Sequence, residues 1–224
     1  MSLKLVWLSH PLGIDDPRPP AIPAPQLSDL YTIEKDGANV QILRLASHTG
    51  THLDSPRHVI PDGLVIGDFD PQELIFTRPV VVDLRLPDAT IVGPEDLEPF
   101  SATLAGADMA LFRFGYGRVR CQEPQRFSSR CPGFGIESGQ WLRLAAPTLR
   151  AIGMDVASVA CIAHLEKTMA VHHELLGGQS RRFLIIEDMN LEHDLTGLRE
   201  VRVSPWLVRE MDSGPCSVVG CFSV

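Results

Sequence analysis

The sequence predicts a single α/β domain built on a twisted, mixed β-sheet. Short apolar runs typical of buried strands recur along most of the chain, and short helical segments lie between them. The 224 residues suit one domain, and no internal repeat or interdomain linker divides them. With 18 glycines and 18 prolines, the chain turns often and leaves little room for long helices. We therefore expect residues 1–224 to form one domain.

The expected elements follow in chain order from these runs. Strands are expected over residues 3–8, 39–53, 79–84, 109–114, 154–162 and 183–187, which are rich in apolar and β-prone residues. Helices are expected from Pro94, where acids fill the first turn, and over residues 137–145 and 166–176. Pro147 ends the second helix, and Gly177 with Gly178 ends the third. Six prolines between residues 10 and 25 exclude regular structure and predict an ordered surface loop.

Charge, cysteine content and the length of the apolar runs indicate which partners and which cellular compartment to expect. With 20 basic and 28 acidic residues, the formal charge is −8, and no local Lys/Arg cluster suggests a nucleic-acid interface. The five cysteines are odd in number and contain no C-x-x-C pair, which favours reduced thiols over a disulfide framework. No apolar run approaches the ~18 residues needed to span a bilayer. We therefore expect a cytoplasmic protein with no nucleic-acid or membrane partner.

One segment carries most of the chemistry. Three of the eight histidines and one aspartate fall within the eleven residues from His48 to His58. His48, His52, Asp54 and His58 are all even-numbered, so an extended backbone points them to one side. Gly50 leaves open space between His48 and His52. Imidazole nitrogens and a carboxylate oxygen in this arrangement can bind a metal ion at roughly 2.0–2.2 Å.

A lone strand histidine is usually structural or exposed, but four such groups on one face need a partner when they are buried. Pro56 is expected to end the strand and to bring His58 back towards the site. Further ligands are sought downstream among His164, Glu166, His172, His173, Glu174, Glu187, Asp188, Glu192 and His193. Glu187 ends an apolar strand, where a carboxylate is costly unless it has a cation or turns into solvent.

From His48 to His58 the chain matches the pattern H-x-G-T-H-x-D-x-P-x-H at every defined position. The sequence thereby resembles the cyclase family of metal-dependent hydrolases, which includes arylformamidases and isatin hydrolases. Weaker similarities cover most of the chain, at Leu8–Pro11, Pro79–Asp83, Leu111–Tyr116, Gly153–Asp155, His172–Leu176 and Glu187–Leu191.

The resemblance implies a swivelling β/β/α fold and a site with one or two zinc or manganese ions. It makes His48, His52 and Asp54 the ligands of one ion and His58 the general acid/base. Asp54, a downstream histidine and Glu187 become the ligands of a second ion, with Asp54 bridging. The spacing to Leu175–Leu176 favours His172 as that histidine, with His173 as the alternative. Members of the family are usually homodimers or homotetramers.

The function that the resemblance implies is hydrolysis of an amide-type C–N bond in an arylformamide or a cyclic amide. The alternative is an oligomeric metal-binding protein of the same fold without hydrolytic activity. Positions that shape the substrate pocket differ from the family pattern. The loop Asp16–Pro20 lacks an aromatic residue, Phe114 and Tyr116 replace Thr and Trp, and the segment Asp212–Cys216 resembles D-G-x-P-x-R without its Arg. The sequence therefore leaves the substrate open.

Overall fold

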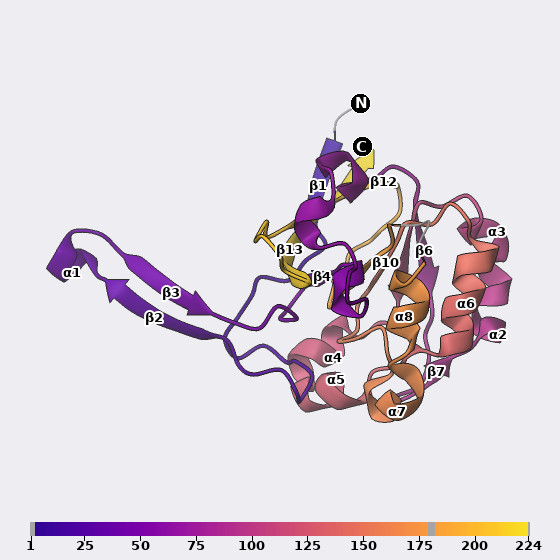
Figure 1. The fold of residues 1–224 in the computed structure, drawn as a ribbon, viewed down its shortest axis with the longest axis horizontal. Helices are drawn as coiled ribbons and strands as arrows, with labels where there is room; N and C mark the ends of the chain where they lie inside the picture. Colours follow the sequence, from indigo (N-terminus) through magenta and orange to yellow (C-terminus); the bar gives the residue numbers. More distant parts are fainter. Residues whose placement is uncertain (1–2, 179–181, 224) are drawn as a thin grey trace.

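A nine-stranded mixed sheet organises this computed structural model, which describes residues 3–178 and 182–223 (Figure 1). The strand order is β5 (Ile75–Phe76), β12 (Leu198–Pro205), β13 (Ser213–Ser223), β4 (His52–Asp54), β11 (Leu184–Glu187), β10 (Ala151–Met154), β8 (Met109–Arg113) and β6 (Pro79–Asp83), with β1 (Leu3–Trp7) paired to β13. β6, β8, β10 and β11 run parallel, and the other pairs are antiparallel. This is the mixed α/β sheet that the sequence predicts.

The parallel strands are apolar up to their last residue because both faces of the sheet are covered. Phe112 packs in a cluster with Leu142 of α6 (Ile136–Ala145) and Leu175 of α8 (Val171–Leu176). The neighbouring Leu111 belongs to a second cluster, which includes Val201 of β12 and Val218 of β13. Since alternate side chains enter different clusters, an alternation of polar and apolar residues is absent from these strands.

The remaining elements are short. The other helices are α1 (Ile33–Asp36), α2 (Pro94–Leu97), α3 (Ser101–Leu104), α4 (Gly117–Gln122), α5 (Pro124–Arg130) and α7 (Leu165–Thr168). Two small ribbons, β2 (Gln26–Tyr31) with β3 (Val40–Arg44) and β7 (Ile91–Val92) with β9 (Gly133–Phe134), complete the strands. Over the described residues, none of the helices has the length and apolar character required of a membrane span.

The ribbon of β2, α1 and β3 projects away from the sheet and its helices (Figure 1). We call residues 26–44 the arm. Its two strands pair with each other, and no other described strand pairs with either of them. The loop of residues 11–25, which we call the strap, connects β1 to the arm and has no regular structure, as its prolines predict.

Three predicted elements differ from the structure. The single strand expected over residues 39–53 is wrong: β3 ends at Arg44, the chain bends, and β4 begins at His52. The strand expected over residues 154–162 is also wrong, because pairing with β8 and β11 ends at Met154. The helix expected over residues 166–176 is divided into α7 and α8.

Candidate metal centre

Pairing of β4 with β11 brings distant parts of the chain to one site. Glu187 at the end of β11 is the register partner of His52 on β4. The predicted site residues come from β4, from the bend before it, from the turn Pro56–His58 after it, and from α8 and β11. All of them line one cavity of about 170 Å³: His48, His52, Asp54, His58, His172 and Glu187.

His48 reaches the cavity by a route that the sequence does not predict. It lies in a bend rather than in a strand, so its direction does not follow from strand alternation with His52. Gly50 adopts φ = 64°, a conformation that a side chain disfavours, and a Cβ at this position would lie 2.9 Å from Leu12 Cδ1. Gly50 therefore permits a sharp bend, rather than clearing space between two histidines on an extended strand.

Backbone carbonyls orient two of the imidazoles. Nδ1 of His52 donates to the carbonyl of Gly50 at 2.8 Å, and Nδ1 of His172 donates to the carbonyl of Met169 at 3.1 Å. A carbonyl oxygen can only accept, so each Nδ1 carries the proton and each Nε2 is left as the free, unprotonated nitrogen in the neutral ring. Metal-binding histidines are typically fixed by such a hydrogen bond from the other ring nitrogen.

Opposite charges are concentrated in the buried part of the cavity. Nε2 of His52 lies 3.3 Å from Oε2 of Glu187 and 3.5 Å from Oδ1 of Asp54. Burial lowers the pKa of His52, but the two carboxylates outweigh it and raise the pKa to about 9. Burial and the neighbouring Asp54 raise the pKa of Glu187, but the His172 and His52 imidazoles outweigh them and lower it to about 2. The site therefore favours ionised carboxylates facing positive charge.

Two buried atoms show that the donor set fits a cation. Nε2 of His52 and Oδ2 of Asp54 have no hydrogen-bond partner among the described residues. Buried polar atoms normally have a partner, and a divalent cation satisfies both at once. The predicted residues form two sets of three in which each residue offers one ligand atom within 4.8 Å of the other two. The sets are His48, His52 and Asp54, and Asp54, His58 and His172. Asp54 belongs to both sets.

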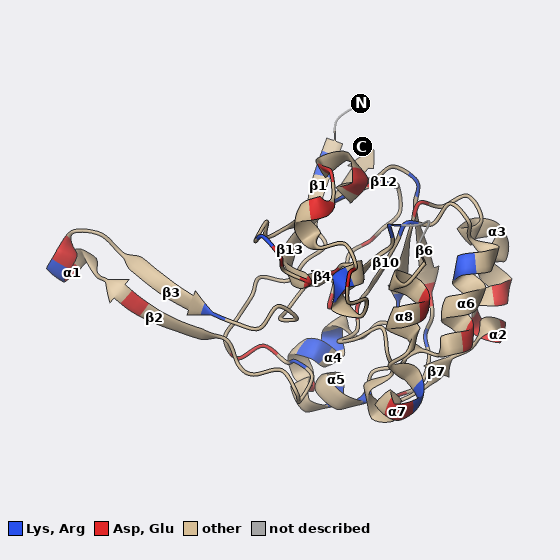
Figure 2. Ribbon diagram, in the orientation of Figure 1, with Lys and Arg blue, Asp and Glu red and all other residues tan. Residues whose placement is uncertain are grey.

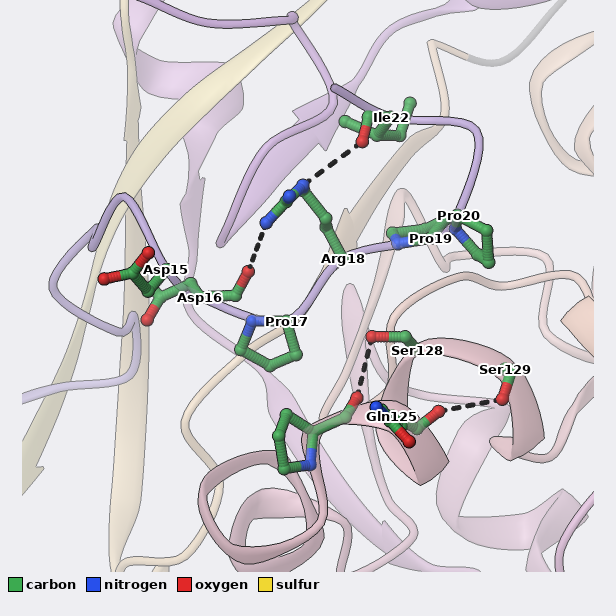
Figure 3. A pocket seen from close by; sticks show the side chains of 11 residues that line it. Asp15, Asp16, Pro17, Arg18, Pro19, Pro20, Ile22, Gln125, Ser128 and Ser129 are labelled. Carbon is green, nitrogen blue, oxygen red and sulfur yellow. Dashed lines mark hydrogen bonds between the residues drawn. The ribbon is translucent and has the colours of Figure 1, made fainter. Parts of the chain in front are cut away.

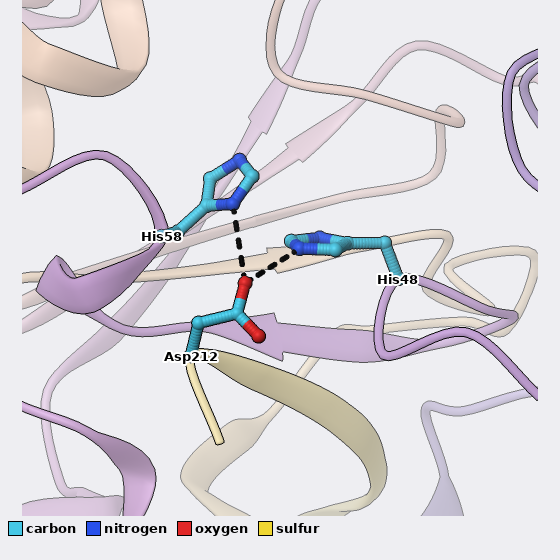
Figure 4. Close-up of side chains that lie close together, drawn as sticks. All are labelled: His48, His58 and Asp212. Atoms are coloured by element: carbon cyan, nitrogen blue, oxygen red, sulfur yellow. Dashed lines mark hydrogen bonds and ion pairs between the residues drawn. The ribbon is translucent and has the colours of Figure 1, made fainter. Parts of the chain in front are cut away.

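A third set adds a residue that sequence reasoning did not include. Oδ2 of Asp212 lies 3.0 Å from Nε2 of His48 and 3.5 Å from Nδ1 of His58 (Figure 4). Asp212 directly precedes β13, whose first residues pair with β4. The only signal in the sequence is the resemblance of Asp212–Cys216 to a family motif, because nothing local connects this aspartate to a histidine 164 residues away.

The structure separates the two candidate histidines of α8. His172 is buried, and its Nε2 lies 3.6 Å from Oε1 of Glu187, whereas His173 is exposed. The backbone N–H of Val159 donates to the same Glu187 oxygen at 2.7 Å and so fixes this carboxylate. Among the described residues, His172 is the only downstream candidate in any of the three sets. The candidates that belong to none of them are His164, Glu166, His173, Glu174, Glu187, Asp188, Glu192 and His193.

The strap borders the metal cavity through Pro19, Ala21 and Ile22. Arg18 stabilises its turn, donating from Nε to the carbonyl of Ile22 at 3.2 Å and from Nη1 to that of Asp16 at 2.9 Å (Figure 3). The same strap and α5 line a second cavity of about 400 Å³. The strap therefore forms part of the wall of both cavities, with its turn held by Arg18.

A buried arginine anchors the strap to the metal centre. Arg120 on α4 donates to both carboxylate oxygens of Asp188, at 2.7 and 3.0 Å, and to Oδ2 of Asp16 on the strap at 3.0 Å. Asp188 follows Glu187 directly and adopts φ = 53°. Burial raises the pKa of Asp188 to about 6 although Arg120 opposes this rise. One guanidinium therefore connects the strap to the residue beside a candidate ligand.

Known proteins with similar sequences identify the family of this chain. Residues 6–160 match the Cyclase family, described as "Putative cyclase". The chain belongs to this family. It is 28% identical to a kynurenine formamidase of Bacillus anthracis, over 96% of each chain.

Solved structures show the same fold in the family. Isatin hydrolase A from Labrenzia aggregata superposes with a TM-score of 0.82 at 17% identity, covering 99% of this chain and 94% of that one. Isatin hydrolase A from Ralstonia solanacearum superposes with a TM-score of 0.84 at 16% identity, covering 99% and 92%. The predicted cyclase-like α/β fold class is thereby confirmed.

Proposed function

We propose that this cyclase-family protein is a metal-dependent hydrolase of amide-type C–N bonds other than peptide bonds. Its similarity to a kynurenine formamidase over nearly the full length supports the reaction class. The observation that carries the proposal is the pair of buried atoms without a hydrogen bond, Nε2 of His52 and Oδ2 of Asp54, at the centre of a histidine and carboxylate cluster. Such atoms are expected of a metal centre and are costly in any other role. Residues 1–224 form one hydrolase domain in this proposal.

The proposed ligands of one ion are the set His48, His52 and Asp54. When a second ion is bound, Asp54 and His172 hold it together with Glu187, whose Oε1 lies 3.6 Å from Nε2 of His172. Imidazole and carboxylate ligands suit zinc, and manganese accepts the same donors. When bound, such a divalent ion lowers the pKa of a coordinated water towards about 7 and polarises a carbonyl group.

The chain itself supplies proton transfer and orientation. Nδ1 of His58 faces Oδ2 of Asp212 at 3.5 Å, which leaves Nε2 to take a proton from the attacking water and to return it to the leaving nitrogen. Asp212 also faces His48, so one carboxylate orients both rings (Figure 4). Oδ1 of Asp54 accepts a hydrogen bond from Ser213 Oγ at 2.9 Å, which fixes the carboxylate shared by both ligand sets.

The walls of the cavity favour an aromatic or cyclic substrate. Beyond the polar cluster, the lining is mostly apolar and comes from the strap and from the segment before α8, with Ile22, Ile162, Leu165 and Met169. A strap without an aromatic residue gives this wall a branched aliphatic surface. An arylformamide or a cyclic amide of modest size matches these walls, since apolar pockets with few polar groups favour apolar ring systems.

The five cysteines are free, and four of them are buried, which supports a cytoplasmic protein with reduced thiols. We propose a homodimer or homotetramer, as is usual in the family, acting on a small molecule.

The test is an assay of the purified protein, loaded with zinc or manganese, on arylformamides, lactams and isatin. Hydrolysis of any of them that a chelator abolishes and that the metal restores supports the proposal. Elemental analysis of the native protein gives the identity of the metal and the number of ions. A protein that binds metal stoichiometrically and hydrolyses none of these substrates is instead the binding protein of the alternative hypothesis.

A further inference from the structure

A cavity of about 510 Å³ lies next to the metal centre, and none of its described lining residues also lines the metal cavity. It forms where the end of β1 and the start of the strap meet the bend before β4, the loop after β11 and the start of β13. A cavity of this volume is large enough for a small-molecule ligand. The hydrolysis proposed above uses none of the residues in its walls.

Two tryptophans give this cavity aromatic walls. Trp7 is the last residue of β1, and Trp206 directly follows β12. Trp7 is 61% exposed and Trp206 is 46% exposed, although indole rings are highly buried on average. Leu12 of the strap adds an aliphatic side chain to the same walls. Indole rings left open to water in a cavity are stabilised by a flat ring that packs against them.

Polar side chains without partners lie in the same walls. The side chains of Asn190, His193 and Ser217 make no hydrogen bond with other described residues. Their backbones are held, since the N–H of Asn190 donates to the carbonyl of Leu8 at 2.9 Å and Arg113 donates to the carbonyl of His193 at 3.4 Å. The side-chain amide of Asn190 presents a donor and an acceptor side by side. A second amide group is complementary to this pair.

The cavity offers no counter-ion to a charged ligand. Figure 2 marks the Lys, Arg, Asp and Glu residues of the chain, and none of those described lines this cavity. The strand β13, which forms one wall, has no such residue along its length. Burial and the nearby Arg120 lower the pKa of His10 to about 4, so this lining imidazole is neutral at pH 7. A charged ligand would lose hydration here without gaining an ion pair.

We propose that this cavity is a second binding site, for a neutral, planar aromatic molecule that carries an amide or lactam group. The ring packs against the indoles of Trp7 and Trp206, and the amide forms hydrogen bonds with Asn190. A plain aromatic hydrocarbon would leave Asn190 without a partner, and an aromatic carboxylate would bring an uncompensated charge. The site does not depend on the proposed hydrolysis, because its residues are separate from those of the metal cavity.

Hydrogen bonds connect the wall of this second site to the backbone of the metal centre. Oγ1 of Thr51 accepts from the backbone N–H of His10 at 3.0 Å and donates to the carbonyl of Asp188. Thr51 directly precedes His52, and Asp188 directly follows Glu187. A molecule in the second site therefore contacts a residue adjacent to one candidate ligand and hydrogen-bonded next to another, while touching neither of them.

The first experiment titrates benzamide and benzoate into the metal-loaded full chain and measures binding by ligand-observed NMR. The two probes have nearly the same planar shape and differ in charge. We expect benzamide to bind with a Kd below about 1 mM, as suits a ligand of its size. After removal of the metal with a chelator, the benzamide Kd should change by less than about twofold. In this metal-free protein benzoate should bind at least about tenfold more weakly than benzamide.

The second experiment locates the bound benzamide with substitutions. Asn190→Ala removes the complementary amide and should raise the Kd about fivefold. Trp206→Ala removes an indole wall and should raise it about tenfold. Both side chains are partly exposed and make no side-chain hydrogen bond within the described chain, so the fold is retained.

Trp141→Phe is the matched control, because Trp141 lies on α6 outside the cavity and is the third of the three tryptophans of the chain. This variant should bind benzamide as the wild type does. Its remaining fluorescence comes from Trp7 and Trp206, so benzamide should change its emission with the Kd that NMR gives.

Four results would each overturn the proposal: no benzamide binding at about 10 mM, benzoate binding as tight as benzamide in the metal-free protein, binding that chelation abolishes, or a Kd that Asn190→Ala and Trp206→Ala leave unchanged. A protein that binds benzamide in the expected way and hydrolyses no amide refutes the proposed function and supports the second site.

Discussion

Replacement of Arg120 with Ala should be among the most destabilising single changes near the metal centre. The guanidinium is 6% exposed and makes three charge-assisted hydrogen bonds, two to Asp188 and one to Asp16. Removing it leaves the buried Asp188 carboxylate without its cation, and breaking a buried ion pair in this way costs about 3–5 kcal/mol. For a chain of this size, each kcal/mol corresponds to about 2–4 °C in melting temperature. We therefore expect a decrease of roughly 10 °C.

The assay is thermal and chemical unfolding of Arg120→Ala, Asp188→Asn and the double variant, at one fixed metal concentration. Asp188→Asn removes the charge that Arg120→Ala leaves unpaired, so the double variant should lose clearly less stability than the sum of the single variants. Asp16→Asn weakens the more exposed contact of Arg120, at an oxygen that also accepts from the backbone N–H of Gly13, and should cost about 1 kcal/mol. A loss below 1 kcal/mol for Arg120→Ala, or strict additivity in the cycle, refutes the role given to this arginine.

Three further predictions concern the metal, the proton carrier and acid stability. His58→Ala should lower kcat at least about 100-fold and leave the metal content of the purified protein unchanged; loss of metal would place His58 among the ligands instead. Adding metal at about 100 times its Kd to chelator-treated protein should raise the melting temperature by roughly 5–10 °C. The Asp54→Asn substitution should abolish this rise. An equal rise in the variant contradicts the assignment of Asp54 as a ligand. Hydrogen bonds from Arg126 and Tyr116 lower the pKa of Asp88 from 3.8 to about 2, so its contribution is present above about pH 4 and is lost as the pH falls towards 2. Asp88→Asn should therefore cost up to about 1 kcal/mol at pH 7 and clearly less at pH 2, where about half of the Asp88 carboxyl is protonated. A cost that unfolding curves show to be independent of pH contradicts this reasoning.

The sequence predicts the sheet strands that follow from local patterns. Residues 109–112 and 184–186 are apolar runs that are fully buried, and residues 79–82 form an apolar run that is half-buried or buried. A run of this kind can be recognised without knowing its neighbours. The strand Ala151–Met154 escapes prediction because it contains Gly153 and no long β-prone run. Val156 and Val159, which suggest a strand, are instead buried in the loop after it. There Asp155 accepts backbone hydrogen bonds from Phe114 and Gly115 and so holds the loop against β8.

Local patterns also predict most of the metal motif, but strand alternation gives the wrong account of His48. His52 and Asp54 lie on a real strand, so strand alternation predicts their common direction correctly. His48 does not, because the left-handed conformation of Gly50 depends on the packing of Leu12 and on the bend around it. Asp212 joins the cluster only through the pairing of β13 with β4, which is a long-range contact. Patterns with a period of two residues reveal strands, but they do not reveal which strands meet.

The apolar core explains why the two central candidate ligands hold their positions. β4 has three residues and is paired on both sides, with His52 opposite Glu187 of β11 and Pro215 of β13. Between the two polar residues, Leu53 is fully buried in the cluster on the other face of the sheet. A shift of register by one residue would turn His52 and Asp54 into that apolar cluster and expel Leu53, because successive side chains in a strand point to opposite faces. The free energy of burying one leucine therefore helps to fix the direction of an imidazole and a carboxylate, and the core constrains the geometry of the metal centre as directly as the hydrogen bonds around it.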